Sequence, residues 1–384
     1  MKKVTKNGIG IVCSCFLLHA PVYGADISWS GFGSVVGGKT TNTSKLASGA
    51  SSTYQVDPTL SGMRDAIYND KLSFRPDTNF GLQLLANLSD GLAITAQLTS
   101  RGGNDFEMEA EWLYVSYSVT PQFIVNAGRQ RMPLYLYSDY LDVGFAYHWL
   151  RAPIEVYGEG ISVYEGISGL YNNYIGDWDY EIQAYVGAGH NETAVIGDTA
   201  LIDAKGLIAT ISNDWLKFRA SAHGAEGWVD VSALPAPAQL MGEDNPQDFL
   251  FKSVGLFIDP GSYFVGAEFT TLEFDEFAQS GSTGVTFDFR ESWMVTAGVR
   301  IGEFTPHVTL SNRVITLSDH AVPALNDLEQ SSETTIVGLR YDFHPKAALK
   351  VEYTSAKDTS DDALTAGGKK LEVDVLSAGI DFIF

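Results

Sequence analysis

Apolar and polar residues alternate with a period of two along most of the chain. The segments 80–88 and 92–99 place an apolar side chain at almost every second position, and the turn-forming Ser-Asp-Gly at 89–91 separates them. The same alternation returns at 293–300 and 335–343. Successive side chains of a β-strand point to opposite faces of the sheet. The pattern therefore predicts strands with one apolar and one polar face, and the turn at 89–91 predicts a hairpin.

Short and long connections alternate between the predicted strands. The short turns lie near 89–91, 120–122, 175–177, 212–214, 259–262, 302–303 and 344–346. The long loops are 40–72, 101–108, 132–160, 188–200, 225–248, 273–289, 314–332 and 357–370. These seven turns and eight loops separate sixteen strands. The phase is ambiguous at 27–37 and 249–258, so the count can change by two. We predict an all-β fold, a transmembrane antiparallel β-barrel of about sixteen strands.

A soluble β-sandwich also shows alternation and is the alternative fold. Three features favour the barrel: a polar face rich in Gly, Thr, Ser and Gln, the strict asymmetry of turns and loops, and aromatic residues where apolar faces meet turns. Those aromatic residues, which would form an interfacial girdle, are Trp178, Tyr180, Trp215, Tyr263, Trp293, Tyr341 and Phe343.

The first 24 residues have the features of a secretory signal peptide. Three lysines precede a short apolar run at 9–18, and Val22-Tyr23-Gly24 provides a cleavage site before Ala25. The apolar run is too short for a helix that crosses a membrane, which needs about 20 residues. The sequence therefore predicts a signal peptide at 1–24, export through the secretory pathway, and a mature barrel at 25–384.

Charge and cysteine content narrow the choice of function. The chain carries 47 acidic and 25 basic residues, a net charge of −22. Loss of the signal removes three lysines and no acid, which leaves a net charge of −25, and it also removes Cys13 and Cys15. Such acidity argues against nucleic-acid binding. Without cysteine the mature chain would have no disulfides. The sequence after the signal has no run of 18 uncharged apolar residues, so the chain would cross a membrane with strands and not with helices.

The last strand ends on the final residue of the chain. Its apolar face carries Leu376, Ala378, Ile380, Phe382 and Phe384. In this feature the chain resembles the Gram-negative outer-membrane porin superfamily, of the general diffusion, gammaproteobacterial type. That resemblance implies that Ile380, Phe382 and Phe384 form an assembly signal for the barrel-assembly machinery. Glu372 and Asp374 depart from the pattern, because they fall on the lipid-side phase.

The long loop 132–160 resembles the third external loop of that family, which follows strand five and folds into the lumen as a constriction. The resemblance implies that its carboxylates Asp139, Asp142 and Glu155 face the throat, although solvated loop charges are the simpler reading. Its aromatic residues could stack on sugar rings; they are Tyr135, Tyr137, Tyr140, Tyr147 and Trp149.

The height of residues on the opposite wall of the throat can be estimated by counting residues from the short turns, because a spanning strand has about 9–11 residues. This places Arg129, Arg131, Arg219 and Arg313 at mid-height and Arg75 and Arg101 higher, while Arg300, Arg340 and Lys350 lie near turns, in the periplasmic vestibule. Arginines facing loop acids would create a transverse field. Arg129 and Arg131 share the phase of the apolar 123–127 segment, so they could instead point outward; we favour the inward reading.

Motifs for other chemistry are missing from the sequence. There is no Gly-x-Ser-x-Gly, and the six mature histidines show no metal-ligand spacing. Gly31-x-Gly33 opens no βαβ unit, so a nucleotide site is unsupported. Acidic loops around 243–244 and 358–362 could bind divalent cations, but solvated charges are the simpler reading. The sequence therefore predicts no catalytic residues, no cofactor and no metal.

The function expected from these features is that of a porin in the outer membrane of a Gram-negative bacterium. It would be a homotrimer that passes ions and small hydrophilic solutes by passive diffusion, in contact with membrane lipid and lipopolysaccharide. The first alternative is a substrate-selective porin for a sugar or an anion. An outer-membrane hydrolase and a soluble adhesion sandwich are further alternatives; the former would need a serine–histidine pair on an outward face near the external rim.

Overall fold

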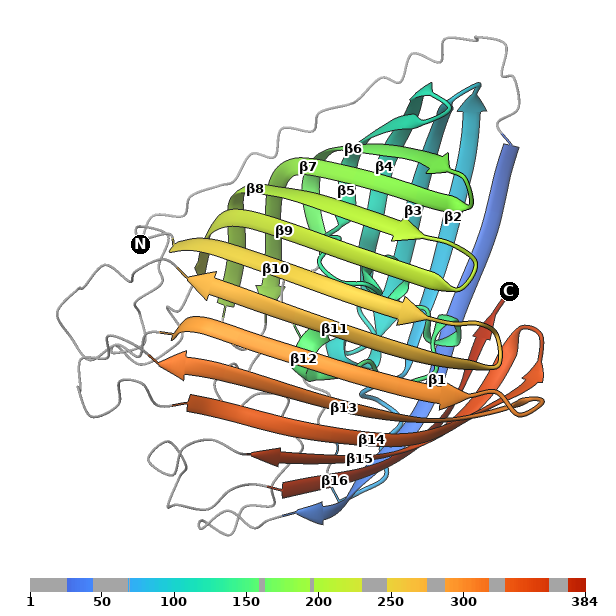
Figure 1. Ribbon diagram of the computed structural model, residues 1–384, viewed down its shortest axis with the longest axis vertical. Helices are drawn as coiled ribbons and strands as arrows, with labels where there is room; N and C mark the ends of the chain where they lie inside the picture. The colour runs from blue at the N-terminus through green and yellow to red at the C-terminus, as the bar shows by residue number, and fades with distance from the viewer. Residues whose placement is uncertain are drawn as a thin grey trace, which may run out of the picture.

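The computed structural model describes residues 26–43, 68, 70–158, 163–193, 197–229, 247–274, 287–317, 329–358 and 372–384. Within these ranges sixteen strands form one closed antiparallel barrel (Figure 1). Each strand pairs with its neighbours in sequence, and the first pairs with the last. The prediction of sixteen strands is confirmed, and the sandwich alternative was wrong. The predicted signal peptide lies outside the described residues.

The strands are β1 (Asp26–Thr43), β2 (Asn79–Ser89), β3 (Leu92–Arg101), β4 (Met108–Thr120), β5 (Phe123–Arg131), β6 (Val163–Ile175), β7 (Trp178–Thr193), β8 (Gly197–Ser212), β9 (Leu216–Val229), β10 (Gln247–Ile258), β11 (Tyr263–Phe274), β12 (Phe287–Val299), β13 (Phe304–Leu317), β14 (Glu329–His344), β15 (Ala347–Asp358) and β16 (Glu372–Ile383). Each predicted short turn falls between two strands that pair as a hairpin. In the part of the chain that the structure describes, no helix is both long and apolar enough to cross a membrane.

One predicted long loop was wrong. At 188–200 the strands continue, because β7 runs to Thr193 and β8 begins at Gly197. His190 lies opposite Ala200 within this extended ladder. The segment lacks regular apolar alternation, but backbone hydrogen bonds hold a ladder together and do not require apolar side chains. Hydropathy alone therefore missed this extension of the hairpin.

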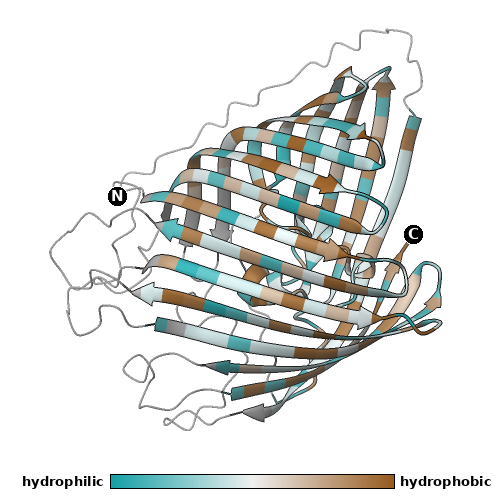
Figure 2. Ribbon diagram, in the orientation of Figure 1, coloured by the Kyte–Doolittle hydropathy of each residue, from teal (hydrophilic) through white to brown (hydrophobic). Residues whose placement is uncertain are grey.

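Hydrophobic and hydrophilic residues follow one another along the strands (Figure 2). Their exposure shows that they lie on opposite faces of the wall. On β13, Val308 and Leu310 are exposed on the outer face, whereas His307, Thr309 and Ser311 are buried on the inner face. Exposed apolar residues recur around the outside of the barrel. A closed barrel has no unpaired edge, and an outer apolar band with a polar interior is the arrangement that lipid requires.

Most of the predicted girdle residues lie near the tight-turn end of the barrel. Trp178 and Tyr263 begin strands, Trp215 lies in a turn, and all three are exposed. Tyr341 near the end of β14 stacks on Phe304, with ring centroids 4.7 Å apart. Trp293 differs, because it lies in the middle of β12 and so outside this ring.

The seam between the first and last strands depends on the terminal residue. The N–H of Phe384 donates to the carbonyl of Gly31 at 3.0 Å, and the N–H of Gly31 donates back at 3.2 Å. The Phe384 ring stacks on Phe80 at 6.1 Å between centroids and lies close over Gly31, where a Cβ atom would overlap it. A glycine at position 31 therefore lets the terminal aromatic ring pack across the seam.

Candidate functional site

The segment 132–158, which we call the inner loop, connects β5 to β6 through the interior of the barrel. It contains three short helical turns, η2 (Ser138–Tyr140), η3 (Gly144–Ala146) and α1 (Ile154–Tyr157). Its side chains and backbone bond inward-facing residues of strands on the far wall, so the predicted folding of this loop into the lumen is confirmed. The last two residues of the predicted range 132–160 lie outside the described residues.

The first part of the inner loop is fixed to β9, β10 and β11. The carbonyl of Leu134 accepts hydrogen bonds from Ser221 at 3.0 Å and Ser253 at 2.8 Å. The N–H of Leu136 donates to the Glu268 carboxylate at 2.9 Å. Backbone groups in a buried loop need partners, and here the wall provides them.

The middle of the inner loop is fixed to β12, β13 and β15. The Trp149 indole N–H donates to Thr309 Oγ1 at 2.8 Å, and the backbone N–H of Leu150 donates to Glu352 at 2.7 Å. Lys350 lies fully buried beneath this part of the loop. Its ammonium group donates to the carbonyls of Gly144 at 2.7 Å and Trp149 at 2.6 Å, and it lies 2.7 Å from the Asp381 carboxylate. The predicted vestibule position of Lys350 was therefore wrong, because the side chain anchors the loop.

Two predicted throat arginines and one predicted throat acid also act as anchors. Arg219 donates to the carbonyl of Pro133 at 2.7 Å, and Arg313 donates to the carbonyl of Glu155 at 3.0 Å. The Glu155 carboxylate accepts from Ser311 at 2.8 Å and is only 3% exposed. Glu155 therefore does not face an open throat, and both arginines hold loop carbonyls instead of lining a hydrated passage.

The aromatic residues of the inner loop form its own core. Tyr135, Tyr137, Tyr147 and Trp149 are all buried, and Tyr137 packs edge-on against Trp149 at 5.3 Å between centroids. Tyr140 is the one of the five that remains half-buried. The prediction that these rings form a stacking surface for solutes was therefore wrong for four of them, because burying them stabilises the loop.

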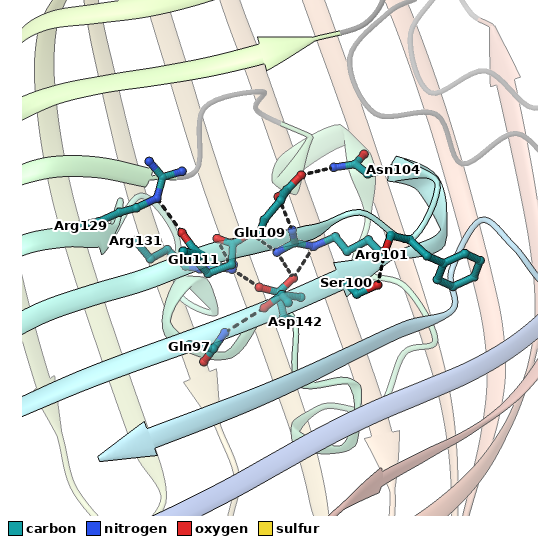
Figure 3. A network of polar contacts seen from close by, with 12 residues as sticks. Gln97, Ser100, Arg101, Asn104, Glu109, Glu111, Arg129, Arg131 and Asp142 are labelled. Atoms are coloured by element: carbon teal, nitrogen blue, oxygen red, sulfur yellow. Dashed lines mark hydrogen bonds and ion pairs between the residues drawn. The ribbon is translucent and has the colours of Figure 1, made fainter. Parts of the chain in front are cut away.

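A network of five charged residues links the inner loop to β3, β4 and β5 (Figure 3). Asp142 pairs with Arg101 at 2.8 Å and with Arg131. Glu111 pairs with both arginines, at 3.2 Å from Arg131, and Glu109 lies 3.1 Å from Arg101. Three carboxylates therefore neutralise two guanidinium groups. The structure brings the predicted Arg101, Arg131 and Asp142 together as direct ion pairs, with no open gap between opposing charges.

Glu111 takes part in this network because of a β-bulge. The register between β3 and β4 shifts there, since Gln97 lies opposite Trp112 while Leu98 lies opposite Ala110. The extra residue, Glu111, is almost fully buried and points to the same side as Trp112. Bulges re-aim side chains in this way. Glu111 was missing from the predicted throat residues. The sequence does carry a signal for the bulge, because polar residues occupy the odd positions in 107–111 and the even positions in 114–116.

The prediction that Arg129 points into the barrel was wrong. It lies opposite Leu113, an exposed residue of the outer face, and pairs there with Glu165. Figure 3 shows its side chain directed away from the Asp142 network. Arg129 shares the phase of Val125 and Ala127, and a period of two carries all three to one face. Arg131 escapes that rule because it is the last residue of β5, where the chain turns into the inner loop.

Three further predicted arginines lie away from the network. Arg75 lies between β1 and β2, is 54% exposed and pairs with the exposed Asp105, so its predicted place at the throat was wrong. Arg300 lies at a tight turn and pairs with Asp259 at 2.6 Å, as expected of a residue near the periplasmic end. Arg340 donates to the carbonyls of Phe145 at 2.8 Å and Tyr147 at 2.7 Å, so it also supports the loop.

Known proteins of solved structure share the fold of this chain. No family model and no curated protein sequence matches the chain. Solved structures do match. The anion-selective porin from Comamonas acidovorans is 14% identical with a TM-score of 0.56, and the alignment covers 94% of this chain and 100% of that one. OmpF of Salmonella typhi, in complex with daunomycin, is 12% identical with a TM-score of 0.57, covering 93% and 97%.

A third match is OmpT, an outer membrane protein of Vibrio cholerae, folded in vitro and in a trimer form. It is 10% identical with a TM-score of 0.53, and the alignment covers 94% of this chain and 99% of that one. All three comparisons extend over nearly the whole chain, and their low identity limits what they show to the fold. The chain therefore has the closed sixteen-stranded β-barrel fold of the outer-membrane porins.

Proposed function

We propose that this protein is a passive channel in the outer membrane of a Gram-negative bacterium, through which ions and small hydrophilic solutes diffuse. The observation that carries the proposal is the inner loop, which is fixed inside a closed barrel with an apolar outside and a polar inside. A loop held in that place narrows a water-filled passage, and diffusion through a pore needs a narrow hydrated throat and no reactive group.

The same proposal includes how the protein reaches the outer membrane and what it contacts there. The protein would be exported with its signal peptide and would contact membrane lipid and lipopolysaccharide. The C-terminal residues Ile380, Phe382 and Phe384 would be read by the barrel-assembly machinery. The exposed Phe384 ring and its place at the seam support a role in closing the barrel.

We further propose that the protein is a homotrimer, with part of its outer face covered by another copy. Arg129 and Glu165 form an ion pair on the outer face of β5 and β6, between the exposed apolar residues Leu113 and Ile167. Charged side chains facing hydrocarbon are costly, so a protein partner is a better environment for this pair than lipid. β5, with nine residues, is also the shortest strand that the structure describes.

The alternatives from other classes have less support. A sugar-selective channel would need exposed aromatic rings, but four of the five candidate rings are buried in the inner loop. A hydrolase would need a histidine on an outward face near the external rim. Among the histidines whose side chains the structure describes, His148, His223 and His307 are buried inside, and His344 lies at a tight turn. We therefore propose a channel and no enzymatic activity.

Planar-bilayer recording of the purified protein tests the proposal. We expect stepwise conductance increments in the presence of salt. A matched preparation of heat-unfolded protein, which has lost the barrel, is the control and should give no steps. If correctly folded protein, verified by its β-rich circular dichroism, also gives no steps, the channel proposal is wrong.

A further inference from the structure

The inner loop does not occupy the lumen evenly. Inward side chains of β9 to β15 lie buried against it, such as Ser221, Glu268 and Thr309. Near the tight turns, the inward side chains of β4 to β8 are half-buried or exposed; they include Tyr114, Asn126, Asn172, Glu181 and Thr210. Higher up, Tyr164, Tyr185 and Ile208 are buried in one cluster with the aromatic residues of the loop. The open passage at the tight-turn end therefore runs along the wall formed by β4 to β8.

A cavity of about 400 Å³ marks the tight-turn end of that passage. Its lining includes inward residues of β6, β7 and β8, namely Asn172, Asp179, Glu181, Thr210 and Ser212. The lining carries two carboxylates and no cationic side chain. A solute that follows this wall therefore passes acidic and hydrogen-bonding groups.

The inner loop adds another carboxylate above this cavity. Asp139 in η2 is exposed, in contrast to its buried neighbours in the loop. It interacts electrostatically with Glu181 on β7 and Lys217 on β9, both of which are half-buried. None of the three side chains forms an ion pair or hydrogen bond with another described residue, so their charges remain available to ions in the passage.

The cations near this passage are mostly neutralised. Arg101 and Arg131 share three carboxylates in the Asp142 network. Arg219 is buried, and its guanidinium holds a loop carbonyl, although its charge also acts on Glu181. Lys217 is therefore the main accessible positive charge, and it interacts with two accessible carboxylates, Asp139 and Glu181.

We propose that the passage prefers cations to anions, with Asp139 and Glu181 as the residues that set the preference and Lys217 as the residue that opposes it. This inference rests on the proposed channel function. Fixed carboxylates in a confined, low-dielectric passage raise the local concentration of cations and exclude anions. Small inorganic cations and small organic amines are therefore the favoured solutes.

The reversal potential under a potassium chloride gradient tests this preference. We expect the unmodified channel to be cation-selective at an ionic strength near 0.1 M, where the Debye length of about 10 Å lets charges act across the passage. Asp139→Asn and Glu181→Gln should each lower the potassium-to-chloride permeability ratio by about twofold or more, because each removes one unscreened charge. Lys217→Gln should raise the ratio by a similar factor.

Asp90→Asn is the matched control, because it removes one carboxylate from the exposed turn between β2 and β3 and should leave the ratio unchanged. An anion-selective unmodified channel would overturn the inference. So would unchanged ratios in the Asp139, Glu181 and Lys217 variants with normal conductance steps. A complete lack of conductance steps would instead contradict the channel function itself, so the two failures are distinguishable.

Discussion

The ammonium group of Lys350 and the carboxylate of Asp381 lie 2.7 Å apart, and both side chains are fully buried between the barrel wall and the inner loop. The same ammonium group donates to two loop carbonyls, so one side chain of β15 joins the wall, β16 and the loop. Breaking a buried ion pair from one side leaves the other charge without compensation, whereas replacing both partners is often tolerated.

Lys350→Met should therefore release the middle of the inner loop. We expect a loss of roughly 3–5 kcal/mol in unfolding free energy, the usual cost of stranding a buried charge. Single-channel recording should show a noisier current, because the loop loses two hydrogen bonds and gains freedom to move. The double variant Lys350→Met with Asp381→Asn should recover part of the stability. Equal stability of the single and double variants would show that the pair is not coupled.

Asp142→Asn should change both the loop and the selectivity of the passage. It removes a carboxylate that Arg101 and Arg131 share, which leaves two guanidinium groups with two carboxylates. The reversal potential should shift toward anions, and urea unfolding should begin at a lower concentration. Glu291→Gln, which removes an exposed charge from β12, serves as the control. A reversal potential equal to that of the unmodified channel would contradict the placement of Asp142 beside the passage.

Arg129 and Arg131 differ by two positions in sequence and should behave differently. Arg131→Ala removes a charge from the interior network and should shift the reversal potential toward cations. Arg129→Ala removes an outer charge, so the reversal potential should stay constant while the proposed trimer dissociates at a lower temperature. Reversal potentials and gel migration after stepwise heating measure the two effects. The same shift of reversal potential in both variants would mean that Arg129 also faces the passage.

Asp259 and Arg300 give a pH-dependent contact at a tight turn. Hydrogen bonds from the Arg300 guanidinium lower the pKa of Asp259. The pair therefore stabilises the folded state above the unfolded pKa, near 3.9, and this stabilisation is lost as the pH falls through the lower folded pKa. Arg300→Gln should raise the pKa of Asp259, as measured by carbon-13 NMR of its carboxyl group. The effect on stability should be small because both groups are partly exposed.

Lys346→Gln, at a different turn, is the control for that titration and should leave the Asp259 pKa unchanged. If Arg300→Gln also leaves it unchanged, the turn contact does not persist in solution.

The alternation of apolar and polar residues determined the barrel, because a period of two fixes which face of each strand meets lipid. Turn residues and loop lengths then set the number of strands and the end at which the long loops lie. The resemblance at the C-terminus and in the loop after strand five also indicated that this loop folds inward. The alternation alone would have placed Arg129 on the outer face, as the structure does, because Arg129 shares its face with Val125 and Ala127.

Only the tertiary structure decided which charges the passage presents. The position at which the loop meets the far wall decides whether a side chain faces water or holds the loop, as for Glu155, Arg219 and Arg313. Contacts between residues far apart in sequence determine this position. A bulge at Glu111 and the turn after Arg131 re-aimed two side chains against the local period. Asp139, Glu181 and Lys217 come from a loop and two separate strands, so their proximity is a property of the closed barrel and not of any segment of the chain.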